Sequence, residues 1–290
     1  MIKQINCHIC YRICEIFSRS RFHIFNLAMK NEIDFLFLLG GHDLEMVEIR
    51  NMLDGYKQSN NPPLAIHYLD HDLHWGAKLS SYSIGISETK AGKIAGIELV
   101  EDIQVPENYL CIDHHGERAE LPSSIDQVAE LLGLPLSRYQ QLIAINDRLY
   151  IPGMADFGAT KEEIELIRHS DRKSQGVTET DEWLAATSVQ DHLSVKNGIT
   201  VVKALTSKFS TITDRLYPTP KLIVYNDQSL VYYGIKAGKL QETFSELKAK
   251  HLVYSGGGAD GFFGFTETAL SFYPEKEKLI NTIIQTVSYE

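Results

Sequence analysis

Short runs of apolar residues alternate along most of this chain with longer stretches in which apolar positions recur at helical spacing. The first run, at 34–39, is apolar at every position after the aspartate, which is typical of a strand covered on both faces of a sheet. Apolar runs at 64–69, 94–100 and 109–112 predict three further strands. This alternation predicts an α/β fold, with a mostly parallel sheet and helices on both of its faces.

Helical patterns follow the predicted strands. A pair of glycines closes the first strand, and apolar residues then recur at helical spacing over 44–53. Ser123 opens another helix, for which Gly133 is the stop signal. A further helix starts at Ser137 and ends near 146–148. These helices complete the strand–helix alternation of the first half of the chain.

The pattern changes twice after this alternation, which predicts the domain organisation. Residues 29–158 would form the larger domain. Residues 159–217 are strongly polar and mostly helical in pattern, so we expect a helical connecting region there. After two prolines, residues 218–290 return to short strands and helices and predict a smaller α/β C-terminal domain. Its expected strands lie at 222–225, 230–233, 252–254 and 262–272, and its expected helices at 241–250 and 275–287.

The N-terminal segment, 1–28, differs from the rest. It holds four basic residues against one acid, and three of the four cysteines, Cys7, Cys10 and Cys14. Two of these stand at a zinc-ligand spacing, but a second ligand pair at matching spacing is missing. We therefore expect an appendage outside the fold, with Met29 as a candidate start of the folded protein.

Composition narrows the functional classes. The 290 residues are 43% hydrophobic, and 28 Lys and Arg stand against 38 Asp and Glu, a net charge of −10. This excess of acid argues against binding to duplex DNA or to an anionic membrane. No apolar run is long enough to cross a membrane, and charges interrupt the apolar stretches near the start, unlike a signal peptide. With Cys111 as the one further cysteine, no disulfide framework is indicated, and we expect a cytoplasmic protein.

Acidic and histidine residues gather where the strands of the larger domain end. The four clusters are His42-Asp-Leu-Glu45, Asp70-His-Asp72, Glu101-Asp102 and Asp113-His-His115. The carboxyl ends of parallel strands meet at one edge of a sheet, where ligands bind. So many carboxylates on one edge would repel each other unless cations lay among them. Imidazole and carboxylate ligands together suit Mn²⁺, Zn²⁺ or Fe²⁺.

The tripeptide Asp113-His114-His115, placed after an apolar strand, resembles the signature of the DHH phosphoesterase superfamily. The order of motifs is similar too: an early His42, Asp102 after a later strand, the tripeptide, Asp147 after a following helix pair, and the glycines 256–258. The resemblance covers residues 33–272. It implies a metal-dependent hydrolase with a substrate-binding C-terminal domain.

The resemblance also implies roles for individual residues. His115 and Asp113 would be catalytic, with Asp113 either a metal ligand or the residue that orients His114. The implied metal ligands are His42, Asp43, Asp70, Asp102, Asp113, His114 and Asp147, for two Mn²⁺ ions, with Mg²⁺, Zn²⁺ or Fe²⁺ as alternatives. The implied substrate-binding residues are Arg148, Gly256, Gly257 and Gly258.

Two positions depart from the superfamily. Its first motif has two aspartates, four and six residues after the histidine, where this chain has Met46 and Glu48. Asp70 or Asp72 is a candidate replacement. The glycine motif continues with Ala259-Asp260 where the superfamily has histidine, so an anion would meet a carboxylate there.

The first hypothesis is therefore a phosphoesterase that hydrolyses a phosphodiester or phosphoanhydride of a small nucleotide, a short oligonucleotide or a similar anion. The departures support a second: a catalytically weakened relative that binds a nucleotide or a partner protein. A metal-dependent hydrolase of another substrate class is the third. The sequence leaves a homodimer open.

Overall fold

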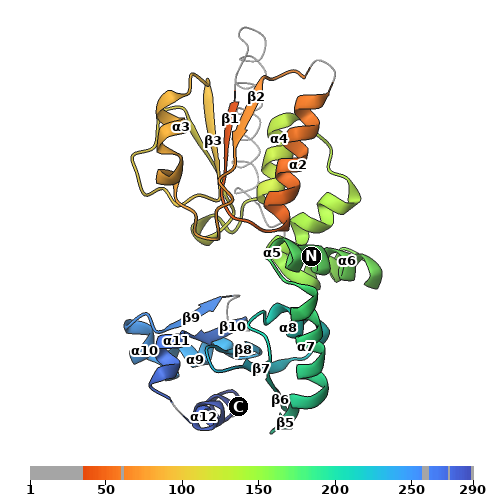
Figure 1. Ribbon diagram of the computed structural model, residues 1–290, viewed down its shortest axis with the longest axis vertical. Coiled ribbons are helices and arrows are strands. Elements are labelled where there is room, and N and C mark those ends of the chain that lie inside the picture. Colours follow the sequence, from red (N-terminus) through yellow and green to blue (C-terminus); the bar gives the residue numbers. More distant parts are fainter. Residues whose placement is uncertain (1–34, 60–61, 257–260, 274, 289–290) are drawn as a thin grey trace, which may run out of the picture. The chain divides into compact units, whose positions relative to one another are not determined.

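The computed structural model describes residues 35–59, 62–256, 261–273 and 275–288. The chain divides after Gln175 into two compact units (Figure 1). The expected appendage at 1–28, with its three cysteines, lies outside the described residues. Within the described residues, no helix has the length and apolar character needed to cross a membrane.

The first unit is built on a four-stranded, all-parallel sheet with strand order β2-β1-β3-β4 (Figure 1). The strands are β1 (Phe35–Leu39), β2 (Ile66–Leu69), β3 (Lys93–Ile97) and β4 (Tyr109–Ile112). β1 lies in the interior of the sheet, and all five of its side chains are buried. The predicted α/β class with a parallel sheet is confirmed.

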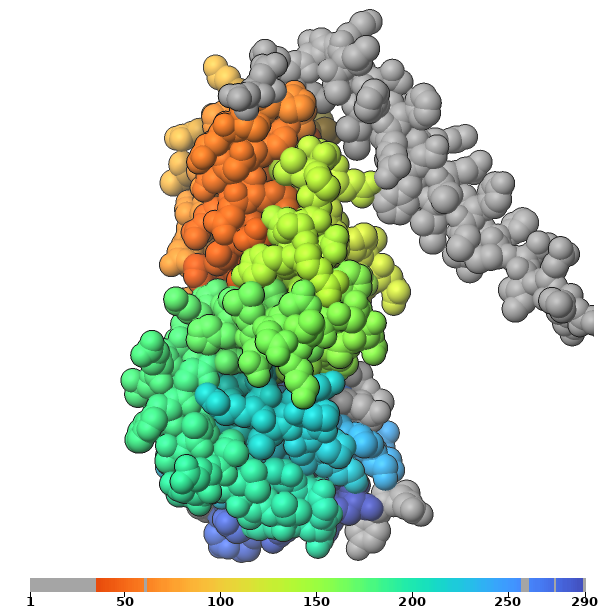
Figure 2. All heavy atoms as spheres, turned by 90° about the vertical axis from the view of Figure 1, so that its right-hand side faces the viewer, coloured from red at the N-terminus to blue at the C-terminus, as the bar shows by residue number. Residues whose placement is uncertain are grey.

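Helices cover both faces of this sheet, as the unbroken apolar run of β1 predicts. Phe35, Phe37 and Leu39 face a core that also holds side chains of α2 and α4. Leu36 and Leu38 face the opposite core, beside η1. Figure 2 shows α2 and α4 side by side along the first unit. The helical elements of this unit are α2 (Leu44–Gln58), η1 (Leu79–Tyr82), α3 (Ser83–Glu88), η2 (Gly116–Arg118), α4 (Ser124–Leu132), α5 (Arg138–Asp156) and α6 (Lys161–Ser174).

Local capping explains where the helices next to the sheet begin. The side chain of Asp43 caps α2 by accepting from the backbone N–H of Met46 at 2.9 Å. Ser123 caps α4 in the same way, and Gly133 ends α4 in the left-handed region with φ 67°. Both predicted ends of α4 are therefore confirmed.

Helix α5 is longer than its sequence pattern predicts. It starts with a capping box formed by Ser137 and Gln140, and it continues past the expected end near 146–148 to Asp156. It is kinked where Tyr150 takes φ 56° and ψ −153°, just before Pro152. The kink lets a second helical segment, which contains Pro152, follow the first.

The second unit contains a six-stranded, mostly antiparallel sheet with strand order β5-β6-β7-β8-β10-β9, in which only β6 and β7 pair in parallel. Helices bury an apolar core on each face. The strands are β5 (Leu193–Lys196), β6 (Ile199–Lys203), β7 (Lys221–Tyr225), β8 (Leu230–Gly234), β9 (Val253–Gly256) and β10 (Phe262–Phe265). The helices are α7 (Glu179–His192), α8 (Ser210–Arg215), α9 (Ala237–Thr243), α10 (Ser245–Ala249), α11 (Glu267–Ser271) and α12 (Lys276–Ser288).

The stretch expected to be a helical connecting region, 159–217, is arranged differently. Its first helix, α6, belongs to the first unit, and everything from Gly176 onward belongs to the second. Residues 193–203 form the hairpin β5–β6, whose turn places Asn197 and Gly198 at positive φ. Asn-Gly between two short runs is a strong hairpin signal, but the polar surroundings concealed it.

One strand of the second unit is shorter than predicted. The strand expected at 262–272 ends at Phe265, because Thr266 caps α11 by accepting from the backbone N–H of Ala269. The expected helix at 241–250 is divided between α9 and α10. These differences leave the predicted α/β character of this part of the chain unchanged.

Candidate metal centre

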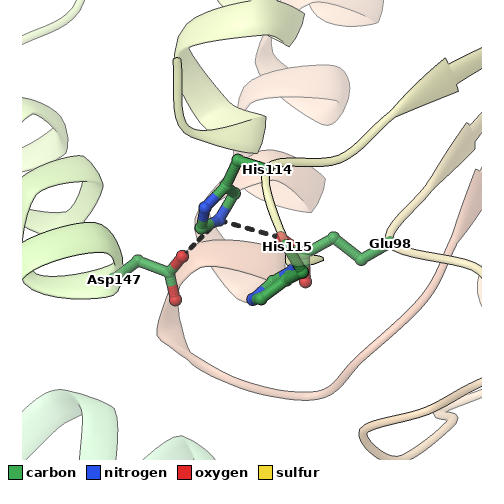
Figure 3. Close-up of side chains that lie close together, drawn as sticks. All are labelled: Glu98, His114, His115 and Asp147. Carbon is green, nitrogen blue, oxygen red and sulfur yellow. Dashed lines mark ion pairs between the residues drawn. The ribbon is translucent and has the colours of Figure 1, made fainter. Parts of the chain in front are cut away.

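The ends of β3 and β4, together with α5, bring four ligand-type side chains to one place. Glu98 follows β3, His114 and His115 follow β4, and Asp147 lies on α5. Each offers one ligand atom, and these atoms all lie within 4.8 Å of one another. Figure 3 shows the four side chains converging from three separate elements. Of the clusters expected at the carboxyl edge of the sheet, the one after β4 contributes His114 and His115 to this group.

His114 is at the centre of this group. Its side chain is 5% exposed, and its Nε2 lies 2.5 Å from Oδ2 of Asp147, 3.5 Å from Oε1 of Glu98 and 3.7 Å from Oε2 of Glu45. Yet Nε2 of His114, Oδ2 of Asp147 and Oε2 of Glu45 are all buried and without a hydrogen-bond partner. Buried polar atoms left unsatisfied in this way are costly unless something else binds them. Nitrogen and oxygen donors that point at a shared space fit a divalent metal ion.

Glu98 is a site residue that the sequence pattern missed. It is the first residue after β3 and takes the left-handed φ of 52°. Its Oε1 accepts from the hydroxyl of Ser124 at 2.8 Å. Gly40 lets β1 approach this turn, because a Cβ there would lie 2.2 Å from the carbonyl oxygen of Ile97.

Asp102, predicted as the ligand after the third strand, lies elsewhere. The strand ends at Ile97 and not at Val100, so the carboxylate at its end is Glu98. Both oxygens of Asp102 accept hydrogen bonds from Ser80, from its backbone N–H at 2.9 Å and from its hydroxyl at 2.7 Å. These bonds lower the pKa of Asp102. The break of the apolar run at Glu98 was the available signal.

Two further carboxylates lie at the start of α2. Burial raises the pKa of Asp43 to about 7, and the negative charges of Glu98 and Asp147 add to the effect. Glu45 is 2% exposed, and its Oε1 accepts from the backbone N–H of Ile125 at 3.1 Å. Burial raises its pKa as well. Asp43 and Glu45 thus border the group, and the start of α2 adds to its negative charge.

The His42 and Asp70 positions are not brought into the group. Nδ1 of His42 lies 2.7 Å from Oδ1 of Asp72. Asp70 accepts from Nη1 of Arg50 at 3.1 Å and from the backbone N–H of Asp72 at 2.8 Å. The polar atoms of this loop therefore have partners of their own.

Asp113 orients His115 and not His114, which the sequence had given as its partner. Its Oδ1 accepts from the backbone N–H of His115 at 2.9 Å and lies 2.9 Å from Nδ1 of the same ring. A proton on Nδ1 would donate to Asp113 and leave Nε2 of His115 as the acceptor. Asp113 Oδ2 lies 3.5 Å from Nη1 of Arg118.

The predicted substrate-binding residues belong to both units. Arg148 is exposed, and its Nη2 donates to the carbonyl oxygen of Ala119 at 3.5 Å, so it lies against the segment that follows the DHH tripeptide. Gly256 ends β9 in the second unit. Gly257 and Gly258 lie outside the described residues, as do Ala259 and Asp260.

The electrostatics of the group favour a cation. Burial would lower the pKa of His114, but the carboxylates of Asp147, Glu45 and Glu98 together raise it to about 12. Burial would likewise raise the pKa of Glu98, whereas the nearby imidazole of His114 and the hydrogen bond from Ser124 lower it overall. The carboxylates around His114 therefore strongly stabilise a positive charge at Nε2. A divalent ion would satisfy the same charges better than one proton does.

Among known proteins, no family model and no curated protein sequence matches the chain. The pGpG-specific phosphodiesterase PggH from Vibrio cholerae is similar in structure, with a TM-score of 0.47 and 12% identity over 89% of this chain and 100% of that one. The DHH domain of PF0399, a member of a family of ribosomal proteins, gives a TM-score of 0.49 and 11% identity over 99% and 93%.

RecJ from Thermus thermophilus, solved in complex with Mg²⁺, gives a TM-score of 0.46 and 12% identity over 90% of this chain and 51% of that one. The same protein has also been solved with Mn²⁺. The PF0399 structure is described by name as a DHH domain, the domain type that the sequence motifs of this chain resemble. The chemistry of this chain rests on the side-chain geometry described above.

Proposed function

We propose that this chain is a DHH-type phosphoesterase that binds a divalent metal ion through Glu98, His114 and Asp147 and hydrolyses a small phosphorylated substrate. The observation that carries the proposal is the convergence of ligand atoms around Nε2 of His114. Three buried polar atoms there lack hydrogen-bond partners. The sequence resemblance supports the reaction class, and the geometry supports this location for the metal.

A metal explains this arrangement better than a structural ion pair does. A buried pair is expected to saturate its hydrogen bonds, because an unpaired buried charge costs several kcal/mol. Here Nε2 of His114 faces carboxylate oxygens of Asp147, Glu98 and Glu45 within 3.7 Å, more acceptors than a single N–H can serve. Several ligand atoms gathered around one point are arranged as the ligands of one metal ion are.

When bound, the ion would lower the pKa of a bound water and stabilise charge on the phosphoryl oxygens. The side chains divide the remaining work. Asp113 holds the ring of His115, so that Nε2 of His115 can ligate the ion or move a proton. Arg118 and Arg148 lie along the loop of the tripeptide and offer guanidinium groups to a phosphate.

Although the first motif is altered, the start of α2 still brings two carboxylates to the site. Met46 is buried in the core, whereas Asp43 and Glu45 place two carboxylates at the start of α2. We propose Asp43 and Glu45 as the residues that extend the site toward a second ion. His42 and Asp70 have other partners and are not needed in this proposal.

Metal titration of the purified chain is the direct test. Mn²⁺ binding would be measured by calorimetry, with Mg²⁺, Zn²⁺ and Fe²⁺ compared. Hydrolysis would be assayed on a linear dinucleotide such as pGpG, a short oligonucleotide and a phosphoanhydride. Absence of metal binding, or hydrolysis that survives both His114→Ala and Asp147→Asn, would overturn the proposal.

The second candidate is a protein of this fold that binds a nucleotide or a partner protein without turning it over. Buried Met46, at a position where the superfamily has an aspartate, favours it. Stoichiometry separates the two: bound metal with hydrolysis supports the enzyme, whereas tight nucleotide binding without either supports the binding protein.

A further inference from the structure

Helix α6 carries a buried ion pair that the proposed chemistry does not use. Arg168 and Asp171 are each only 6% exposed, and Nη1 of Arg168 donates to Oδ2 of Asp171 at 2.7 Å. Burying two charges costs free energy that their attraction often fails to recover. In other proteins, well-packed apolar side chains of similar volume often replace a buried ion pair without loss of stability. The other contacts of the two side chains therefore indicate what the pair does.

Arg168 reaches α5 beside a proposed ligand. The same Nη1 atom donates to Oδ1 of Asn146 at 3.0 Å, and Asn146 directly precedes Asp147. The guanidinium also stacks on the ring of Tyr150 at 4.2 Å, at the kink in α5. Arg168 thus contacts α5 immediately before Asp147 and again where the helix bends.

Asp171 reaches the other side of the same site. Its Oδ1 accepts from the backbone N–H of Leu44 at 3.5 Å, the first residue of α2, and from Nε2 of Gln175 at 3.0 Å. Leu44 lies between Asp43 and Glu45. A carboxylate at a helix N-terminus is favourable, because the N–H groups there have no partners within the helix.

We propose that Arg168 and Asp171 are positioning residues that fix the distance between Asp147 and the start of α2, and thereby the affinity of the site for its metal. The inference rests on the proposed function. It extends that function to a helix that supplies none of the proposed ligands. The chain of contacts runs from Asn146 through Arg168 and Asp171 to Leu44, and each link is a directional hydrogen bond.

The test replaces the pair with apolar side chains of similar size, Arg168→Met with Asp171→Leu. Net charge is unchanged and the packing volume is nearly kept, so the fold is expected to persist. Removing groups that orient metal ligands typically weakens metal binding by ~10–100-fold. We expect that loss for Mn²⁺, measured by calorimetry, while circular dichroism and thermal unfolding report on the fold.

An arginine–carboxylate pair that joins α5 to α6 provides the control. Arg138 donates to Glu163 at 3.2 Å, is exposed, and touches none of the proposed ligands. Arg138→Met with Glu163→Gln removes this pair, and the glutamine keeps the capping box of α6. Mn²⁺ affinity should then stay within about twofold of that of the wild type.

Each outcome decides the proposal. If the folded Arg168→Met, Asp171→Leu protein binds Mn²⁺ as the wild type does, the pair is structural only and the inference is wrong. If that variant unfolds, Arg168→Lys, which keeps the charge but loses the stacked fork, should still weaken Mn²⁺ binding, and unchanged binding would contradict the inference. A wild type that binds no Mn²⁺ overturns the proposed function itself, before any variant is compared.

Discussion

Two loops of the first unit look alike in sequence and differ in the structure. Asp70-His-Asp72 follows β2, and Asp113-His-His115 follows β4. In the first loop, Asp70 is paired with Arg50 and Asp72 with His42, so its polar atoms are satisfied within the surface. In the second, Nε2 of His114 is buried among carboxylates and lacks a hydrogen-bond partner.

The difference shows what distinguishes a metal site from an acidic surface. Residue type and position after a strand are shared by both loops. Only the second loop has a buried histidine nitrogen without a hydrogen-bond partner. Its environment depends on residues that are distant in sequence, such as Asp147 and Glu45. The comparison therefore predicts that substitutions around His114 weaken metal binding, whereas substitutions around Asp70 and Asp72 leave it unchanged.

The largest contrast is expected between His114→Ala and His42→Ala. Removing the central imidazole should weaken Mn²⁺ binding by at least ~100-fold, since loss of a ligand costs more than loss of a group that merely orients one. His42→Ala should leave Mn²⁺ binding within about twofold, because its partner is Asp72. Calorimetric titration of both variants measures this, and equal losses would show that His42 and His114 serve one site.

The next contrast separates the observed carboxylate from the predicted one. Glu98→Gln keeps the size and the bond to Ser124 but removes the charge next to His114, so we expect a ~10–100-fold loss of Mn²⁺ affinity. Asp102→Asn should have no such effect, because both of its oxygens are bonded to Ser80. If Asp102→Asn weakened Mn²⁺ binding and Glu98→Gln did not, Asp102 would be the ligand, as the motif order predicted.

The sequence predicted much of this site because local signals were strong. The tripeptide follows an apolar strand, as the motif order predicts, and Asp147 joins its histidines, although it lies within α5 and not after it. Glu98 was missed because the position of a strand end is the least certain part of a pattern, and here it was misjudged by three residues. Asp70 was predicted from its residue type and its position after a strand. Its hydrogen bond with Arg50, twenty positions earlier in the chain, could not be read from the sequence pattern.

Other features were missed in a polar context or were set by tertiary packing. The hairpin of residues 193–203 lies in a strongly polar stretch and its strand β5 is largely exposed, so its Asn-Gly signal was overlooked. Arg168 and Asp171 lie in the strongly polar stretch 159–217, and the structure buries both. Burial of a charge is set by tertiary packing, which sequence periodicity does not report.

A third contrast concerns protons. Burial would lower the pKa of His114, but the surrounding carboxylates raise it to about 12 from the ordinary 6.5. The folded state therefore keeps a proton that the unfolded chain loses above 6.5. This contribution to stability is complete below pH 6.5 and is lost as the pH rises toward 12, so the metal-free protein should become less stable in alkali.

Because a metal ion must displace that proton, Mn²⁺ binding near pH 8 should release about one proton per ion, and the apparent affinity should rise with pH. Calorimetry in buffers of different ionisation enthalpy counts the protons. His42→Ala should release the same number as the wild type. Binding without proton release in the wild type would mean that the ion avoids Nε2 of His114.

The smallest effect is expected in the loop after β2, and it tests the comparison from its other side. Asp70→Asn removes the charge that faces Arg50 in a partly exposed pair, so the free energy of unfolding should fall by about 1 kcal/mol or less. Mn²⁺ affinity should not change, because Asp70 lies outside the group around His114. Denaturant unfolding and calorimetry on the same sample measure both quantities. A loss of one bound ion with unchanged stability would place Asp70 in a second metal position, and the two loops would then differ in degree and not in kind.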